Sequence, residues 1–106
     1  MVGNIYYIEM PYSNFKQFKG RPVIIFKEID KSDFLVLPLT SNLQREGMLI
    51  TNADIVKGSL KKESVIVVPK ITAIDHSLIC DAHFIASISK QSFKKLETII
   101  CNKLNC

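Results

Sequence analysis

A chain of 106 residues can bury one hydrophobic core but not two, so we predict a single domain over residues 1–106. Hydrophobic residues make up 47% of the sequence and charged residues 23%, which excludes a disordered chain, and no apolar run is long enough to span a membrane. The net charge of +4 favours polyanionic partners without identifying one. Residues 1–10 lack the pattern of a signal peptide, so we expect a cytoplasmic protein without a membrane partner.

Short apolar runs bounded by turn residues predict a series of β-strands. They cover residues 4–9, 23–26, 34–39, 47–51 and 64–68, and a further short strand is expected at 83–87. The run Val23–Phe26 is continuously apolar, which is typical of a strand buried on both faces. Pro38 lies inside the next run and indicates an edge or a bulge there.

The hydrophobic period changes after Ser89. Phe93, Leu96, Ile100 and Leu104 recur at spacings of three and four residues, which predicts a surface helix capped by Ser89. Several short strands followed by one helix predict a mainly β fold with α, built as a small, strongly bent antiparallel sheet or barrel.

Potential metal ligands gather in one short segment, which contains Asp75, His76, Cys80, Asp81 and His83. Their spacing matches no standard zinc pattern, and polar residues in a short loop are usually turn-formers, so we predict no metal site. The three cysteines form no close pair, and we expect reduced thiols.

A basic loop precedes the second predicted strand. Lys16, Gln17, Lys19 and Arg21 bring three positive charges and an amide together, with two phenylalanines interleaved. Such a loop can bind phosphates while its aromatic rings stack on bases. A solvated surface loop whose phenylalanines enter the core is the more ordinary interpretation of the same composition.

Small polar residues follow the third predicted strand at Thr40-Ser41-Asn42. A rigid strand end can direct such groups at a ligand, although turn chemistry explains them equally well. The combination of Arg21 at the end of one loop with Thr40 at the end of the next strand is more informative, because a cation and a hydroxyl donor can converge on one phosphate.

Three stretches share their order and spacing with one known family. They are residues 3–22, which open with Gly-Asn and close with Arg-Pro; Val36–Ser41, which ends in Pro-Leu-Thr-Ser; and residues 58–66 with 71–75. In this arrangement the chain resembles the MazF/PemK toxins of type II toxin–antitoxin systems over nearly its whole length.

The resemblance implies an SH3-like barrel, usually homodimeric, which cleaves single-stranded RNA without a metal or other cofactor and is neutralised by a cognate antitoxin. By position, Arg21 matches the family's catalytic arginine and Thr40 its catalytic threonine. In that chemistry the substrate's 2′-hydroxyl attacks the adjacent phosphate and leaves 2′,3′-cyclic phosphate and 5′-hydroxyl ends. Neither histidine lies in the matched motifs, so the general base stays unassigned.

The RNA-binding residues expected around this pair are Lys16, Gln17, Lys19, Ser41, Asn42 and Lys70. Lys16 stands where many relatives carry a glutamate, and Lys70 replaces a frequent glutamine. Val67 and Pro69 occupy positions where other relatives use an arginine and an aspartate. A more basic groove should bind RNA more strongly and with a steeper dependence on salt.

Two other functions stay open. A CcdB-like DNA gyrase inhibitor would keep the fold and bind a protein, but the gyrase poisons that resemble this family lack the Arg-Pro and Thr-Ser pairs. A noncatalytic module that binds single-stranded RNA would use the basic and aromatic face of a small barrel. For the toxin, a disordered acidic segment of the antitoxin is the natural match to a basic cleft, because it can wrap the surface and mimic phosphates.

Overall fold

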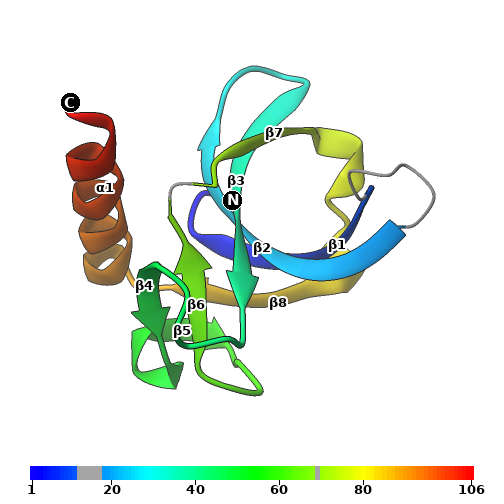
Figure 1. The fold of residues 1–106 in the computed structure, drawn as a ribbon. Coiled ribbons are helices and arrows are strands. Elements are labelled where there is room, and N and C mark those ends of the chain that lie inside the picture. Colours follow the sequence, from blue (N-terminus) through cyan, green and yellow to red (C-terminus); the bar gives the residue numbers. More distant parts are fainter. Residues whose placement is uncertain (12–17, 69) are drawn as a thin grey trace.

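The computed structural model describes residues 1–11, 18–68 and 70–106, which form a curled antiparallel sheet and one α-helix (Figure 1). The strands are β1 Asn4–Pro11, β2 Phe18–Glu28, β3 Asp33–Thr40, β4 Gly47–Ile50, β5 Ile55–Gly58, β6 Ser64–Val67, β7 Thr72–Asp75 and β8 Phe84–Ile88. Three short 3-10 helices connect strands, η1 Asn52–Asp54, η2 His76–Leu78 and η3 Asp81–His83, and α1 Lys90–Leu104 follows β8. The predicted fold class is therefore confirmed.

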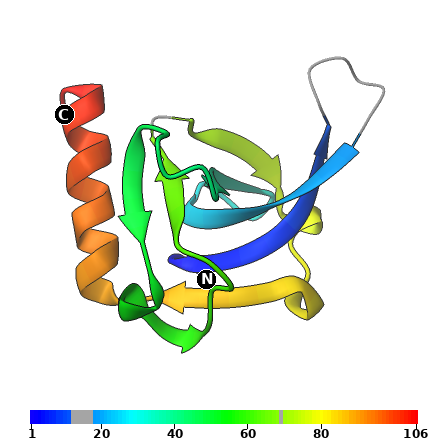
Figure 2. The ribbon, with the colours of Figure 1, turned by 60° about the horizontal axis from the view of Figure 1, so that its bottom comes forward.

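The strands follow the order β4-β6-β3-β2-β1-β8-β5, and β7 pairs with β3 beside this path. β1, β2, β3, β7 and β8 curl around one side of the molecule, while α1 stands next to β4 and β6 on the other (Figures 1 and 2). This curl makes a half-barrel, in which β4 and β5 lie at the two ends of the strand order and β7 is paired on one side only.

The strands predicted from apolar runs are confirmed, and two strands were missed. β5 has the sequence IVKG and is mostly exposed, and β7 has the sequence TAID with one buried residue, Ile74. Both are four residues long and lack the dense apolar content on which the prediction depended.

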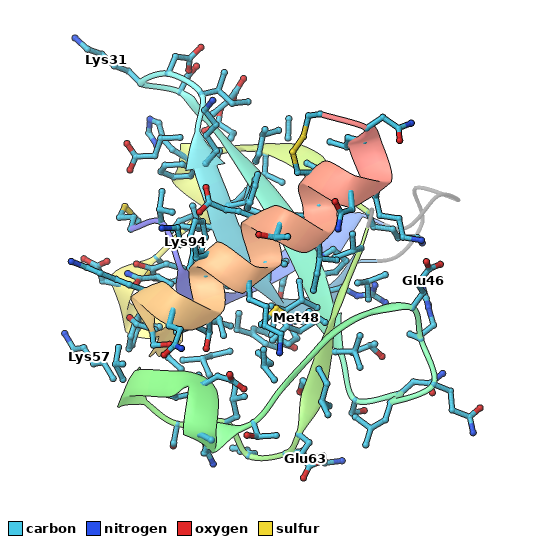
Figure 3. The ribbon with its side chains drawn as sticks, turned by 90° about the vertical axis from the view of Figure 1, so that its left-hand side faces the viewer. Lys31, Glu46, Met48, Lys57, Glu63 and Lys94 are labelled. Atoms are coloured by element: carbon cyan, nitrogen blue, oxygen red, sulfur yellow. A yellow bond between two sulfur atoms is a disulfide. The ribbon has the colours of Figure 1, made fainter. Side chains whose placement is uncertain are left out.

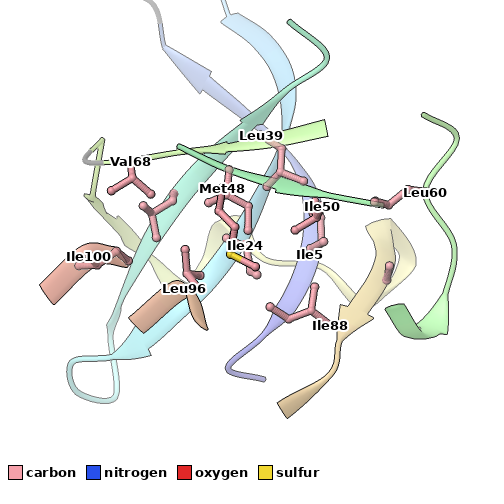
Figure 4. Close-up of a cluster of buried hydrophobic side chains, with 13 residues drawn as sticks. Ile5, Ile24, Leu39, Met48, Ile50, Leu60, Val68, Ile88, Leu96 and Ile100 are labelled. Atoms are coloured by element: carbon pink, nitrogen blue, oxygen red, sulfur yellow. The ribbon is translucent and has the colours of Figure 1, made fainter. Parts of the chain in front are cut away.

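The central strands are buried on both faces, as the run Val23–Phe26 predicted. Ile24 contributes to one core cluster with Ile5, and its neighbours Val23 and Ile25 contribute to the other. Because successive side chains of a strand point to opposite faces, this continuous apolar run supplies a cluster on each face of the sheet, so the buried residues form two clusters where one core was expected. Figure 4 shows the first cluster, in which residues of the central strands meet side chains of α1.

The predicted helix is present, and its cap is confirmed because the Ser89 hydroxyl accepts a hydrogen bond from the Ser92 N–H. Leu96 and Ile100 are buried, and Phe93 packs against the same core. Leu104 is 56% exposed, so its expected place in the buried stripe is wrong. No helix in the described ranges is long and apolar enough to cross a membrane.

The expectation of reduced thiols is corrected for two of the three cysteines. Asn105 adopts a left-handed conformation (φ 59°) after α1, and this turn brings Cys106 to a Cα–Cα distance of 5.1 Å from Cys101, with which it forms a disulfide (Figure 3). Lys103 in the same turn forms an ion pair with Glu46, which ties the end of α1 to the segment between β3 and β4.

A hydrogen-bond network fastens the other end of α1. The buried Ser92 hydroxyl donates to Asp54 Oδ1 at 2.8 Å, and the Ser89 hydroxyl donates to Ser92 at 2.9 Å. The second oxygen of Asp54 accepts from the Thr51 N–H at 2.9 Å. The Asp54 carboxylate thus joins the start of α1 to η1. Because η1 connects β4 to β5 in the chain, this contact also holds the two strands at the ends of the strand order.

We predict that Asp54→Ala lowers the free energy of unfolding by about 2–3 kcal/mol, because it removes two hydrogen bonds to a charged group and leaves the buried Ser92 hydroxyl without its acceptor. Urea denaturation measures this. Glu97→Ala, which removes an exposed acid from α1, is the matched control and should change stability by less than about 0.5 kcal/mol. Equal effects of the two substitutions would contradict the role assigned to Asp54.

Candidate functional site

The site begins where two neighbouring strands stop pairing. β2 and β3 are paired as far as Val23 and Pro38, and beyond this point Leu39 and Thr40 are paired with β6, which lies on the opposite side of β3 from β2. The first residues of β2, through Pro22, have their partners on β1. A gap therefore opens between the β1–β2 hairpin and the end of β3.

Pro22 explains why the pairing stops there. The Ile25 carbonyl accepts a hydrogen bond from the Gly3 N–H at 2.8 Å, so the backbone groups of Ile25 face β1. Alternation along the strand then turns the backbone groups of Ile24 and Pro22 toward β3. Because proline has no N–H, Pro22 cannot donate the next bond to β3, and the ladder ends.

The gap forms a cleft of about 730 Å³. Its lining comes from the β1–β2 hairpin, the end of β3, the segment between β5 and β6, and the start of β8: Tyr7, Gly20, Arg21, Pro22, Leu39, Thr40, Ser41, Ser59, Leu60, Lys61, Lys62, Ser64, Phe84 and Ile85. The two residues predicted as catalytic, Arg21 and Thr40, thus line the same cleft.

Strand register places Arg21 and Thr40 on the same face of the sheet. Val23 is paired with Pro38, and Arg21 and Thr40 each lie two residues further on toward the gap. Since residues two apart on a strand share a face, both side chains belong to the face of Val23. Tyr7 is paired with Pro22 and belongs to the opposite face, so the gap is lined from both sides of the sheet.

Local hydrogen bonds orient the Thr40 hydroxyl. Its oxygen accepts from the Asn42 N–H at 3.1 Å, which leaves the hydroxyl hydrogen available for a ligand. The turn continues because Asn42 Oδ1 accepts from the Gln44 N–H at 3.1 Å, and the Arg45 N–H donates to the Asn42 carbonyl at 3.2 Å. Thr40 therefore begins a hydrogen-bonded turn and also keeps a hydroxyl hydrogen that can bind a ligand.

Asn52 holds the opposite wall of the cleft. Its side chain accepts from the Leu60 N–H at 2.8 Å and donates to the Leu60 carbonyl at 3.1 Å. Leu60 is buried, and the exposed Lys61 and Lys62 follow it directly. This pairing fixes the backbone from which the two lysines extend.

The charged side chains of the cleft are all positive among the described residues. Among the described residues its lining contains the three cations Arg21, Lys61 and Lys62 and no carboxylate. Like charges around a concave surface focus the potential and attract an anion. The cleft is therefore suited to a polyanionic ligand.

The structure gathers only part of the predicted RNA-binding set around the cleft. Ser41 lines it, whereas Asn42 and Lys70 are exposed outside its lining. Lys16 and Gln17 lie outside the described residues, as does the side chain of Lys19. Tyr7, Ser59, Ser64 and the Lys61-Lys62 pair are additional lining residues; only the lysine pair carried a signal in the sequence, as a basic dipeptide after a turn.

The five potential metal ligands of residues 75–83 are dispersed over β7, η2, η3 and their connections, and all five are exposed. Within the described ranges no three His, Cys, Asp or Glu side chains gather as a metal would require. The Ser77 N–H, then the Ser77 hydroxyl, hold the pKa of Asp75 below its usual value, which suits a residue that caps η2.

Asp30 is held in the same way in the turn between β2 and β3. Its carboxylate accepts from the Ser32 N–H and hydroxyl, both at 2.8 Å, and from the Asp33 N–H at 3.0 Å, and these bonds lower its pKa. A lowered pKa means that the stabilisation is present near neutral pH and is lost as the pH falls through the aspartate range. Neither carboxylate lines the cleft.

Comparison with known families agrees with this fold. The chain is by class a toxin of a type II toxin–antitoxin system, because the model of the family described as PemK-like, MazF-like toxin of type II toxin–antitoxin system matches residues 1–104. The chain belongs to this family, and the family implies an antitoxin as its partner. No curated protein matches the chain significantly.

We predict that Asn52→Ala raises the hydrogen-exchange rate of the Leu60 amide by about tenfold or more, because this buried N–H loses its acceptor. Exchange followed residue by residue by NMR measures the effect. Asn42→Ala, which alters an exposed turn after β3 and outside the lining of the cleft, should leave the Leu60 rate unchanged. Unchanged protection of Leu60 in Asn52→Ala would show that the pairing does not hold this wall.

Proposed function

We propose that the protein is an endoribonuclease that cuts single-stranded RNA in the cytoplasm, without a metal ion, and acts as the toxin of its system. The observation that carries the proposal is that Arg21 and Thr40, which match the family's catalytic arginine and threonine, lie on one face of the sheet at one cationic cleft. The family membership of the chain supports the same function.

The reaction is an internal phosphoryl transfer. The 2′-oxygen of a ribose attacks the adjacent phosphorus, the bond from phosphorus to the 5′-oxygen breaks, and the products carry 2′,3′-cyclic phosphate and 5′-hydroxyl ends. The proton of the 2′-hydroxyl leaves during the attack, and the departing 5′-oxygen gains one. DNA lacks the attacking group and is not a substrate.

Arg21 and Thr40 stabilise the charge that develops on the phosphate. The guanidinium of Arg21 is planar and can donate two parallel hydrogen bonds to phosphate oxygens. Thr40 adds a third donor, because its oxygen is already occupied by the Asn42 N–H and its hydrogen remains free. Donors fixed before the substrate arrives stabilise the transition state without having to reorganise.

We further propose a homodimer and an antitoxin that covers the cleft with a disordered, acidic segment. Exposed leucines support the first part, because Leu43, Leu49 and Leu104 are 51%, 53% and 56% exposed. The cations of the cleft support the second, since carboxylates of the antitoxin would occupy the positions of RNA phosphates. An antitoxin without an acidic segment would contradict this second part.

We predict that wild-type protein cuts a long single-stranded RNA into discrete fragments with 5′-hydroxyl ends in excess chelator, and that Arg21→Ala and Thr40→Ala each slow cutting by about 10²- to 10³-fold. End labelling with a kinase before and after phosphatase treatment identifies the ends. Arg45→Ala and Thr98→Ala remove the same side-chain types from exposed positions outside the cleft and should cut normally. Intact RNA with every protein would favour a CcdB-like gyrase inhibitor.

We predict that the double variant Lys61→Ala/Lys62→Ala binds single-stranded RNA more weakly and with a shallower dependence on salt. Each lost phosphate contact reduces the slope of log K against log salt by about 0.7 for single strands, so the slope should fall by about 0.7–1.4. Lys94→Ala/Lys95→Ala removes an equal charge from α1, away from the cleft, and should keep the wild-type slope. Identical slopes for the two double variants would exclude a phosphate contact at Lys61-Lys62.

A further inference from the structure

Tyr7 is the one aromatic side chain that is exposed among those described. It is 45% exposed, whereas its neighbours on β1, Tyr6 and Ile8, are 3% and 2% exposed. Its ring lines the cleft together with Arg21 and Thr40. An aromatic ring left open to solvent inside a cationic cleft offers a flat apolar surface beside groups that attract phosphate.

Gly20 provides the space for this ring. A β-carbon at Gly20 would lie 1.9 Å from Tyr7 Oη and 2.1 Å from Tyr7 Cζ, so the phenol end of the ring lies against the Gly20 backbone. The φ angle of Gly20 is not positive, unlike those of Gly3, Gly47 and Gly58, so the backbone conformation does not require glycine there. Room for the Tyr7 ring is the structural reason for this glycine.

The ring lies next to the proposed reaction centre. Gly20 directly precedes Arg21, and Tyr7 is paired with Pro22, which follows Arg21. Arg21 and Tyr7 belong to opposite faces of the β1–β2 hairpin, and both line the gap. In a nucleotide the base and the phosphate extend from the ribose in different directions, so a strand in the gap can present its phosphate to Arg21 and a base to Tyr7.

We propose that Tyr7, seated on Gly20, is the stacking platform for the base of one nucleotide that flanks the phosphate bound at Arg21 and Thr40. This inference rests on the ribonuclease function proposed above. The contact uses the face of the base, which every base has, so it sets the affinity and position of the strand rather than the identity of the base. Tyr7 is thus a binding residue that aligns the scissile phosphate with the two donors.

The test measures binding of a single-stranded RNA. The cleavage site of this RNA is first mapped with the wild-type protein, and a 2′-deoxy substitution at that site then prevents cutting. If wild-type protein cuts nothing, a mixed-sequence single-stranded RNA is used. Fluorescence anisotropy gives the affinities of wild type, Tyr7→Phe, Tyr7→Ala and Gly20→Ala. Thermal melting checks that each variant is folded. Because the chain contains three tyrosines and no tryptophan, the RNA-induced quenching of tyrosine emission that is lost in Tyr7→Phe reports stacking at Tyr7.

Tyr7→Phe keeps the ring and should bind within about twofold of wild type. Tyr7→Ala should bind about 5- to 150-fold more weakly, as expected for the loss of one stacked base. Gly20→Ala retains the ring but displaces it, so it should show a similar loss in a folded protein. An abasic residue beside the scissile phosphate should weaken wild-type binding by the same factor and leave Tyr7→Ala binding unchanged.

The outcomes separate this inference from the proposed function. If Tyr7→Ala and Gly20→Ala bind and cut like wild type while Arg21→Ala does not cut, the platform is overturned and the ribonuclease stands. If no protein cuts RNA but binding depends on Tyr7 and on one base, the platform stands and the catalytic proposal fails. If wild-type protein neither binds nor cuts single-stranded RNA, both are overturned.

Discussion

The missing N–H of Pro22 is the constraint on which the site depends. β2 could otherwise continue to pair with β3, and a closed ladder would leave no gap between them. Because the donor is absent on the side that faces β3, β2 keeps only its pairing with β1, and the end of β3 pairs with β6. The missing donor thus lies where the cleft opens, and Arg21 immediately precedes the residue that lacks it.

Buried contacts in the surrounding sheet compensate for the strand pairing that is lost at the gap. Val23, Ile24 and Ile25 are fully buried and supply cores on both faces of the sheet, so β2 is anchored immediately beside the point where its pairing ends. Asp54 and the serines at the start of α1 fasten the edges, and Asn52 fixes the wall that carries the lysines. Exposed functional groups thus stand on backbone that is held by buried contacts.

In the proposed function, chemistry and binding are divided between the two walls of the cleft. The wall formed by β2 and β3 holds the directed donors Arg21 and Thr40, and the wall between β5 and β6 holds two lysines whose flexible side chains suit a mobile phosphate backbone. Tyr7 adds an apolar surface between charged groups. An RNA strand would meet a cation, a hydroxyl and a ring within one cleft, and an acidic antitoxin segment would meet the same charges.

The sequence alone was sufficient to predict the strands rich in apolar residues and the helix that follows Ser89, because apolar periodicity is a property of the chain itself. The spacing of its motifs was likewise sufficient to select Arg21 and Thr40 together as candidate site residues. The sequence was insufficient for β5 and β7, whose few buried residues become strands only through their partners β8 and β3. It also missed Tyr7, since an aromatic residue in an apolar strand normally enters the core. Only the tertiary structure decided which residues face the cleft, because that depends on where β2 and β3 part, on the glycine beneath the ring and on a loop folded across from them.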